Sequence, residues 1–517
     1  MIVIASVVLF AAASASAQPA PAQTSWKLYW SDEFNGPAGS PPDPKNWDYD
    51  MGAGGWGNGE LENYTNSPLN SFQDGLGHLV IRAIRDAAGN YTSARLQTGS
   101  PGASSSTTNL SWQYGRIEAR IKLPFGQGVW PAFWMLGEDI DTDPWPGSGE
   151  VDIMENFGTF NNNASINNGT AHGPGYSGAN GLGAPIILPA GETVSNGFHV
   201  YSIDWSENSI QWYVDSVLYH TVTSASIPSG TQWVFNAPFF LLLNLAIGGP
   251  STFLGTPDPN APFPNQDMLV DYVRVYEATS TAGPALNAGG IVDAATDLPA
   301  LSPGSLASIY GTGMATTGNS STFDTSTDTF SNDVAGVQVF LNGEASPLIF
   351  LSSDQINFAI PWDSLVGPAL NVEVMLNGIL SNPIPITLGT AAPSLFGIPY
   401  NDSALGVANV AIDSCPNNEA PQAGAYCTLW GNGFGPTNPA LTDGGLAPPP
   451  PLAWTDSTCA LTIDGVTAQV TYCGGAPGEI IYQLNFVFPP GVGSGAQKGT
   501  LTINDNTGNF LIVGPGN

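Results

Sequence analysis

Three carboxylates lie within six residues of an otherwise apolar segment, GEVDIME, which ends at Glu155. Alternate residues of a β-strand share a face, so Glu150 and Asp152 are predicted to point the same way. Glu155 has the opposite parity, and one extra residue within 151–154, a β-bulge, would return it to that face. Three acids on one face push their pKa values apart. Cleavage of a glycosidic bond needs such a split between an anionic nucleophile and a protonated acid.

Tryptophans surround the acidic segment. WPAFW begins at Trp130 and ends at Trp134, and Trp145 follows shortly before the acids. An isolated ExDxxE pattern is more typical of a solvated acidic edge strand. Indole rings are costly to expose without a use, however, and they can stack on the apolar faces of sugar rings. The neighbourhood therefore favours a sugar-binding cleft, with Trp130 and Trp134 on one face of their strand and Phe133 in the core.

The chain resembles glycoside hydrolase family 16, in particular its laminarinase-like (β-1,3-glucanase) branch. The matching blocks are WSDEF (30–34), GGWGNGELENYT (54–65), YTSAR (91–95), YGRIEARIKLPFGQGVWPAFWMLG (114–137), WPGSGEVDIMENFG (145–158), FHVYSIDW (198–205), FFLLLNLAIGG (239–249) and VDYVRVY (270–276). The ExDxxE spacing is the form associated with this branch, and ExDxE with the lichenase-like branch. The resemblance implies an all-β, concanavalin-like jelly-roll sandwich with a cleft on its concave face.

The resemblance also assigns roles to individual residues. Glu150 matches the nucleophile, Glu155 the acid/base, and Asp152 the residue that hydrogen-bonds the nucleophile, while His172 in GTAHG matches a histidine near the acid/base. With one bulge the two glutamates are four strand steps apart, roughly 13 Å between Cα atoms. Converging side chains can close that span to the about 5–5.5 Å of a retaining pair. The residues that match positions lining the donor subsites are Asn58, Arg95, Trp130, Trp134 and Trp145.

A structural calcium site is a further implication of the resemblance. Glu33, Gly77 and Asp271 match its positions on the convex side of many relatives. Two carboxylates and a backbone carbonyl are suitable hard-oxygen ligands for calcium. The chain departs from the pattern at His78, where an asparagine is common. The ion would stabilise the fold and take no part in the chemistry, for which no cofactor is expected.

Length and composition predict several β-domains. A chain of 517 residues exceeds one ordinary domain. With 62 glycines, 44 prolines and only 10% charged residues, it suits short strands joined by turns. The net charge of −32 argues against nucleic acid and anionic membranes as partners. A neutral polysaccharide, bound by a monomer, is the expected partner.

The first 17 residues are predicted to be a secretory signal peptide. An apolar run ends in Ala15-Ser16-Ala17, an A-x-A cleavage pattern, although no Lys or Arg precedes the run. The run is too short for a membrane span, and nothing later in the chain is long and apolar enough. We therefore expect a secreted or cell-surface protein.

Two further sandwich modules are predicted after the catalytic domain of residues 24–278. A small, turn-rich stretch at 279–290 reads as a linker. Beyond it, SLASIYGTGM (305–314), VQVFLNGEAS (337–346) and DQINFAIP (354–361) are echoed in order by AYCTLWGNGF (425–434), ALTIDGVTAQ (460–469) and YQLNFVFP (482–489). These echoes predict immunoglobulin-like modules at 291–392 and 393–517. This half resembles an uncharacterised immunoglobulin-like or TIG-like region of secreted bacterial proteins.

The repeat places Gln355 and Asn357 in register with Gln483 and Asn485. Such repeated polar residues could contact a ligand, but they more often hold backbone at a strand end. All four cysteines fall in the last module, and secretion with an even count favours two disulfides. Because Cys459 and Cys473 flank a predicted hairpin at 464–465, we favour the pairs 459–473 and 415–427. The spacings contain no C-x₂₋₄-C knuckle, which disfavours a zinc site.

The leading functional hypothesis is a secreted, retaining endo-β-1,3-glucanase. A mixed-linkage β-1,3-1,4-glucanase, a family 16 galactanase and a transglycosylase are alternatives on the same fold. From other classes, the chain could be a non-catalytic glucan-binding protein, against which the intact Glu150 and Glu155 argue, or a surface-attachment protein whose C-terminal half is the main actor. Binding of sulfated galactans would require a cationic cleft. The chain has only 10 Lys and Arg residues, which argues against such substrates.

Overall fold

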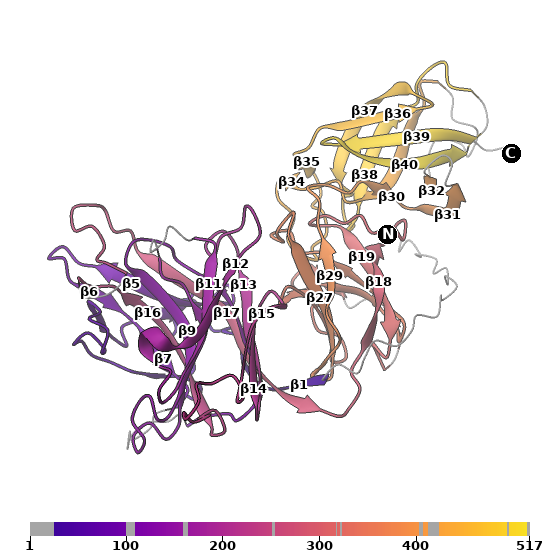
Figure 1. Cartoon of the computed structure of the whole chain (residues 1–517). Coiled ribbons are helices and arrows are strands. Elements are labelled where there is room, and N and C mark those ends of the chain that lie inside the picture. The colour runs from indigo at the N-terminus through magenta and orange to yellow at the C-terminus, as the bar shows by residue number, and fades with distance from the viewer. Residues whose placement is uncertain are drawn as a thin grey trace.

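The computed structural model describes residues 25–99, 109–158, 164–250, 254–316, 318–320, 323–402, 407–411, 423–493 and 496–513. The predicted signal peptide lies outside these ranges. Within them the regular secondary structure consists of β-strands apart from a short 3-10 turn, Gly178–Asn180, which confirms the predicted all-β class. None of the described residues forms a helix long and apolar enough to cross a bilayer. Figure 1 shows a large sandwich at the N-terminal end, followed by two smaller β-units.

Two sheets form the large sandwich. The inner sheet has the order β12-β11-β10-β9-β16-β7-β2. Its strands are β2 (Asp48–Tyr49), β7 (Arg95–Gln97), β9 (Val129–Gly137), β10 (Glu150–Glu155), β11 (Ile166–His172), β12 (Leu182–Ile187) and β16 (Phe239–Ile247). The outer layer contains β1 (Ser25–Asp32), β8 (Gly115–Lys122), β13 (His199–Ser206), β14 (Ser209–Val214), β15 (Val217–Thr223) and β17 (Gln266–Thr279).

Four shorter strands extend this sandwich beside β17. They are β3 (Glu62–Tyr64), β4 (Ser71–Gln73), β5 (Leu79–Arg85) and β6 (Tyr91–Ser93). The core between the two layers follows from strand alternation. Phe133 and Met135 of β9 are fully buried in it, as predicted for Phe133, while Trp130 and Trp134 lie on the other face of the same strand.

The first smaller unit has its own hydrophobic core, drawn from residues 286–388. One sheet contains β18 (Ala285–Asp293), β19 (Leu306–Thr312), β20 (Asn319–Ser320), β25 (Leu348–Leu351) and β26 (Gln355–Ala359). Facing strands are β23 (Val337–Leu341), β24 (Glu344–Ser346), β27 (Ala369–Leu376), β28 (Ile379–Leu380) and β29 (Ile384–Thr387), with a small hairpin of β21 (Phe323–Asp324) and β22 (Thr329–Phe330). Because β18 begins at Ala285, half of the predicted 279–290 linker is strand.

The second smaller unit has a separate core, drawn from residues 391–512. Its strands are β30 (Ser394–Leu395), β31 (Gly397–Asp402), β32 (Val407–Ala411), β33 (Tyr426–Asn432), β34 (Thr437–Asn438), β35 (Trp454–Thr455), β36 (Cys459–Ile463), β37 (Val466–Gly475), β38 (Tyr482–Val487), β39 (Ala496–Ile503) and β40 (Asn506–Val513). The predicted hairpin joins β36 to β37 through Asp464 and Gly465, both at positive φ. The predicted Cys459–Cys473 disulfide is formed. Cys427 is also disulfide-bonded, and Cys415, its predicted partner, lies outside the described residues.

The internal repeat recurs in the hydrogen bonds of the two units. Gln355 Nε2 donates to Asn357 Oδ1 at 2.9 Å in the first unit. Gln483 Nε2 donates to Asn485 Oδ1 at the same distance of 2.9 Å in the second. Each asparagine also accepts a hydroxyl from the neighbouring strand, from Ser308 in the first unit and from Thr428 in the second. These amides therefore bind side chains of their own sandwich, which supports a structural role.

The first unit packs directly against the large sandwich. Strand β1 pairs with β28 at Lys27 and Ile379, so a single sheet of 15 strands runs through both. An apolar cluster at the junction joins Tyr276 to Phe340, Met375 and Leu380. The region before β18 is thus a tight connection, because the strands on either side of it are held together.

Buried charges cross the same junction. Arg120 of β8 donates hydrogen bonds to Asp271 of the large sandwich and to Glu344 of the first unit, both at 2.8 Å. Asn342 donates to the Asp215 carboxylate at 3.0 Å. A buried charge that loses its partner is strongly destabilising, so the first unit contributes to the stability of the outer sheet.

We predict that residues 24–278 alone keep their kcat/KM on soluble oligosaccharides but melt at a lower temperature than the full chain. Truncation uncovers the Tyr276 cluster and removes Glu344 from Arg120, while the inner sheet is unchanged. Each 1 kcal/mol lost lowers the melting temperature by about 2–4 °C in a domain of this size. Calorimetry of both proteins measures the difference. Equal melting temperatures would show that the junction contributes nothing.

Candidate active site

Strand β10 contains the predicted bulge. Against β9, Asp152 lies opposite Trp134 and Glu155 lies opposite Ala132, with the register shifting between Asp152 and Met154. Ile153 is therefore the extra residue, and its side chain is fully buried in the core. Since the partners on β9 differ by two positions, Asp152 and Glu155 share one face despite their different parity.

The bulge is fixed from both sides of the strand. On β11, the partners of β10 also shift between Asp152 and Glu155. From the outer sheet, Trp212 reaches through the core and donates its indole N–H to the carbonyl oxygen of Asp152 at 2.8 Å. Asn168 donates to the carbonyl oxygen of Glu155 at 3.4 Å. These contacts satisfy backbone carbonyl groups where the regular ladder is interrupted.

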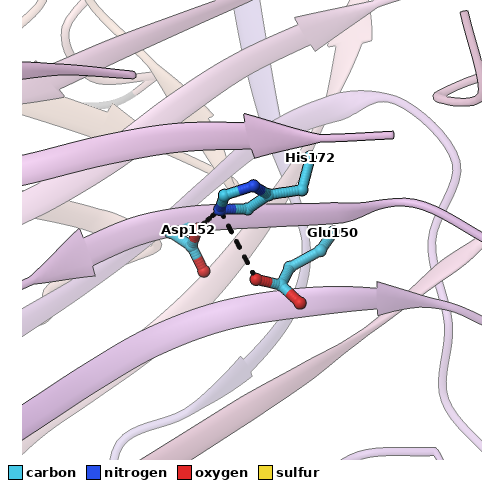
Figure 2. Close-up of side chains that lie close together, drawn as sticks. All are labelled: Glu150, Asp152 and His172. Atoms are coloured by element: carbon cyan, nitrogen blue, oxygen red, sulfur yellow. Dashed lines mark ion pairs between the residues drawn. The ribbon is translucent and has the colours of Figure 1, made fainter. Parts of the chain in front are cut away.

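His172 lies beside the first two acids. It occupies the position on β11 opposite Glu150. Its Nε2 atom is 3.1 Å from Asp152 Oδ2 and 3.7 Å from Glu150 Oε1, and Figure 2 shows the ring above both carboxylates. The Trp145 ring lies 6.4 Å from the imidazole and is 44% exposed. The structure thus gathers the predicted acids, histidine and tryptophan in one place.

Burial and then the charge of Asp152 raise the pKa of Glu150 to about 8. His172 and Arg95 oppose that rise electrostatically, and Trp145 opposes it through a hydrogen bond. Burial also raises the pKa of Asp152 to about 8, while its hydrogen bond with Glu150 lowers it. Each of the two acids thus ionises less readily than a free carboxyl, and the effects of His172, Trp145 and Arg95 favour the ionised form of Glu150.

Glu155 holds its proton more tightly. Burial, followed by the charges of Asp152 and Glu150, raises the pKa of Glu155 well above its usual value. A hydrogen bond from Trp130, at 3.0 Å from its indole nitrogen to Glu155 Oε1, only partly offsets this rise. The cluster thus places an acid that stays protonated beside a pair that ionises first, which suits acid and nucleophile roles.

Arg95 and Trp134 lie on the same face of the inner sheet. The Arg95 guanidinium lies between two indoles, 4.9 Å from the Trp56 ring and 4.8 Å from the Trp134 ring. Its Nε is 3.0 Å from Asp50 Oδ2. Trp134 donates its N–H to Asn244 Oδ1 at 2.7 Å. Stacking on a cation and hydrogen bonding fix the orientation of the indole.

Sequence reasoning missed four polar residues beside these groups. They are Glu60, Glu62 and Tyr64 in the segment after Asn58, and Asn244 in β16. Asn58 donates to Glu60 Oε1 at 3.0 Å, which places it in the same network. A signal was available in both segments. ELENY alternates polar side chains with a period of two, and Asn244 is the sole polar residue of FFLLLNLAI.

The residues of the predicted calcium site are already partnered. Both carboxylate oxygens of Glu33 accept hydrogen bonds from Arg274, at 2.9 and 2.8 Å. Asp271 Oδ2 accepts one from Arg120. Gly77 contributes a backbone position at φ +96°. The negative charges of the two carboxylates are therefore neutralised by arginines. In this arrangement the two side chains fit a calcium ion poorly.

Among the described residues, three groups bring metal-type ligand atoms within 4.8 Å of one another. They are Glu150, Asp152 and His172; Glu192, His199 and Asp215; and Glu344, Asp363 and Asp443. The first is the acid cluster itself. In the second, His199 Nδ1 is 2.7 Å from Asp215 Oδ2, and in the third, Glu344 is held by Arg120.

Known proteins resemble this chain over about half of its length. The family model of glycosyl hydrolases family 16 matches residues 79–249. A β-glucanase from Rhodothermus marinus is 40% identical over 261 residues, which cover 48% of this chain and 85% of the relative. A glucan endo-1,3-β-glucosidase from Cryptopygus antarcticus is 37% identical over 277 residues, covering 49% and 93%. The solved laminarinase catalytic domain from Thermotoga maritima is 43% identical, with 49% and 99% covered and a TM-score of 0.43.

The family match includes the segments that carry the three acids. Residues 79–249 contain the whole of β10 with its three acids, together with His172 on β11 and Asn244 on β16. The two sequence relatives are matched over most of their own length at well above 30% identity. The chain belongs to glycosyl hydrolase family 16 and is a glycoside hydrolase.

Proposed function

We propose that this chain is an endo-β-1,3-glucanase that cleaves β-glucan by double displacement with retention of configuration. The observation that carries the proposal is the bulged strand β10, which sets Glu150, Asp152 and Glu155 on one face with graded proton affinity. The names of the two relatives, a β-glucanase and a glucan endo-1,3-β-glucosidase, support β-1,3-glucan as the substrate.

In the first step, Glu150 attacks the anomeric carbon while Glu155 gives its proton to the departing glycosidic oxygen. The anomeric carbon–oxygen bond breaks, and a glycosyl ester forms on Glu150. In the second step, the Glu155 carboxylate takes a proton from water, and the resulting hydroxide displaces Glu150 from the anomeric carbon. The register gives four steps on β9 between the partners of the two glutamates, Leu136 and Ala132, which is roughly 13 Å. Long side chains that converge can bridge this span.

Asp152 and His172 tune the nucleophile. The hydrogen bond between Asp152 and Glu150 lets the pair lose one proton together. His172, within 3.7 Å of Glu150, favours the ionised carboxylate. Trp130 fixes Glu155 through its indole N–H, so the acid is oriented by a rigid neighbour.

The cleft chemistry favours a neutral glucan over a sulfated galactan. Arg95, the basic residue among the predicted donor-subsite positions, is paired with Asp50 and sandwiched between indoles. A sulfate would have to compete with that carboxylate. The graded acids argue against a purely binding role, because a binding surface gains nothing from three buried carboxyls.

We also propose that the protein is secreted. The disulfide between Cys459 and Cys473 is the structural support, since disulfides persist mainly in oxidising compartments outside the cytosol. The predicted signal peptide is consistent with this location.

We predict that the full chain depolymerises laminarin faster than lichenan or agarose, with initial release of the β-anomer. Retention follows from two successive displacements at one carbon. Proton NMR of the first products reports the anomer, and chromatography reports product length. Initial release of the α-anomer would exclude a covalent glycosyl–enzyme intermediate. Preferential cleavage of agarose would exclude β-1,3-glucan as the preferred substrate.

The matched variants are Glu150→Gln and Glu207→Gln. The first removes the nucleophile at nearly constant volume, and several orders of magnitude in kcat are expected to be lost. The second makes the same chemical change at an exposed residue between β13 and β14, and should leave kcat unchanged. Near-normal turnover by Glu150→Gln would refute its assignment.

We predict that His172→Gln moves the acidic limb of kcat/KM to higher pH. His172 lowers the pKa of Glu150, which is about 8 in the native site. Without the imidazole, the nucleophile ionises only at higher pH, so activity appears later as pH rises. The kcat/KM profile on a soluble oligosaccharide measures the shift. A limb that stays in place or moves to lower pH would show that His172 does not tune Glu150.

On the resemblance alone we keep structural calcium at Glu33, Gly77 and Asp271 as a proposal. An ion there must share or displace the Arg274 and Arg120 contacts, so weak binding is expected. Calcium in hundredfold excess over its Kd stabilises the native state by about 2.7 kcal/mol. The melting temperature should rise with added calcium and fall with EDTA, at unchanged kcat. A melting curve indifferent to both would remove the site.

A further inference from the structure

Two carboxyl groups, Glu60 and Glu62, lie together beside Tyr64 and Arg95. Glu62 on β3 is only 1% exposed, and its Oε2 accepts the backbone N–H of Ile247 at 2.6 Å. Glu60 lies two residues earlier and is hydrogen-bonded to it. The mechanism proposed above uses neither residue. Glu62 is buried and Glu60 is only partly buried. A buried acid beside a second carboxyl needs a physical reason when it has no catalytic role, because two negative charges side by side would be costly.

The pair is the inner end of a hydrogen-bonded chain. Glu60 Oε1 accepts from Asn58 at 3.0 Å, and Glu60 Oε2 accepts from the Tyr64 hydroxyl at 3.3 Å. The same hydroxyl accepts from Asn244 Nδ2 at 2.9 Å. Asn244 in turn accepts the indole N–H of Trp134 at 2.7 Å. One carboxylate therefore connects two of the predicted donor-subsite residues.

The directions of these bonds require a proton between the two acids. Asn58 and Tyr64 both donate to Glu60, so Glu60 is an acceptor on each side and suits the ionised form. Glu62 accepts a backbone N–H on Oε2, and among the described residues no donor reaches its buried Oε1, so a proton on Glu62 that is donated to Glu60 would satisfy this end of the side chain. A protonated Glu62 and an ionised Glu60 satisfy every group, whereas two carboxylates would repel.

The electrostatic surroundings agree with this arrangement. Burial, and then the hydrogen bond and charge of Glu60, raise the pKa of Glu62 to about 9. Tyr64 on the same strand has its pKa raised well above its usual value. The other titratable or charged groups facing this region are Tyr91, opposite Glu62 on β6, and Arg95 on β7. Glu62 thus keeps its proton at neutral pH and loses it as pH rises through about 9.

We propose that Glu60 and Glu62 are a proton-sharing pair of positioning residues, which orient Asn58 and Trp134 for binding the glucan chain. The proposal rests on the proposed function and adds residues to its binding face. The pair acts through other side chains and does not touch the reacting atoms. Among the described residues, the chain of hydrogen bonds ends at Trp134 and includes neither Glu150 nor Glu155. Disrupting the Glu60–Glu62 pair is therefore expected to raise KM and to leave kcat nearly unchanged.

The test is the pH dependence of KM for a soluble laminari-oligosaccharide, between pH 6 and pH 10. Wild-type KM is expected to rise about tenfold as Glu62 ionises, the equivalent of about 1.4 kcal/mol. Glu62→Gln carries an amide that donates to Glu60 in place of the proton. It should keep a near-native KM at pH 7 and lose the alkaline rise. Glu62→Ala should raise KM about tenfold at every pH, with kcat changed less than about twofold.

The matched control is Glu192→Gln, which alters another buried glutamate of the same domain. It should keep the native KM and the alkaline rise. A wild-type KM that stays flat to pH 10, or a Glu62→Gln profile that rises like the wild type, would overturn the proposal. Circular dichroism confirms folding, and if Glu62→Ala does not fold, the Glu62→Gln comparison decides.

Failure of the proposed function is separable from failure of this inference. If the wild type does not cleave laminari-oligosaccharides, the proposed function fails. The protonation of Glu62 can then be followed by tryptophan fluorescence, because Trp134 belongs to the hydrogen-bond network that ends at this pair. A fluorescence transition near pH 9 in the wild type, absent from Glu62→Gln, would support the shared proton. The same transition in both proteins would refute it.

Discussion

One inserted residue in strand β10 is the constraint on which the active site depends. If Ile153 were paired in a regular ladder, with no bulge, strand alternation would send Glu155 into the core and leave only Glu150 and Asp152 on the other face of the strand. The insertion interrupts the hydrogen bonds between strands, and neighbouring residues compensate for this loss. Ile153 is fully buried, and the Asp152 carbonyl accepts the indole N–H of Trp212 from the opposite sheet. The outer sheet, which contributes no acid to this cluster, thereby sets the geometry of the carboxylates.

Burial gives these carboxyls their separate proton affinities. All three lose hydration, but the pKa of Glu150 is lowered by His172, Trp145 and Arg95, whereas the pKa of Glu155 is raised by two acidic neighbours and lowered by His172 and one indole N–H. The same principle recurs at Glu60 and Glu62, where a hydrogen bond between acids replaces a second charge. In both places a low-dielectric site holds more carboxyls than negative charges.

The first smaller unit is part of the architecture that supports the large sandwich. The catalytic sheet continues through β1 into β28, and Arg120 bridges carboxylates from two units. The outer sheet is therefore supported by the first smaller unit, while the three acids lie on the inner sheet. Arg120 and Arg274 also neutralise Asp271 and Glu33, the carboxylates that the family resemblance assigns to calcium.

The sequence alone determined features that depend on local geometry. The period of two predicted the face of Trp130 and Trp134, the burial of Phe133, and the need for a bulge before Glu155, and all three are confirmed. An Asp-Gly turn and its flanking cysteines predicted one hairpin and its disulfide. The ordered echoes predicted two related units, which repeat the same glutamine-to-asparagine bond.

Tertiary structure decided everything that depends on which strands become neighbours. Asn244 and Tyr64 are 180 residues apart, and the Arg120–Glu344 contact spans 224. The sequence of a segment does not indicate which strand it will contact, because side-chain alternation predicts the face on which a residue lies and not the neighbouring strand. The network of Glu60 and the closeness of the first unit were therefore missed. The order of the strands brings residues that are distant in sequence into contact, and the burial that results shifts the pKa values of their carboxyl groups.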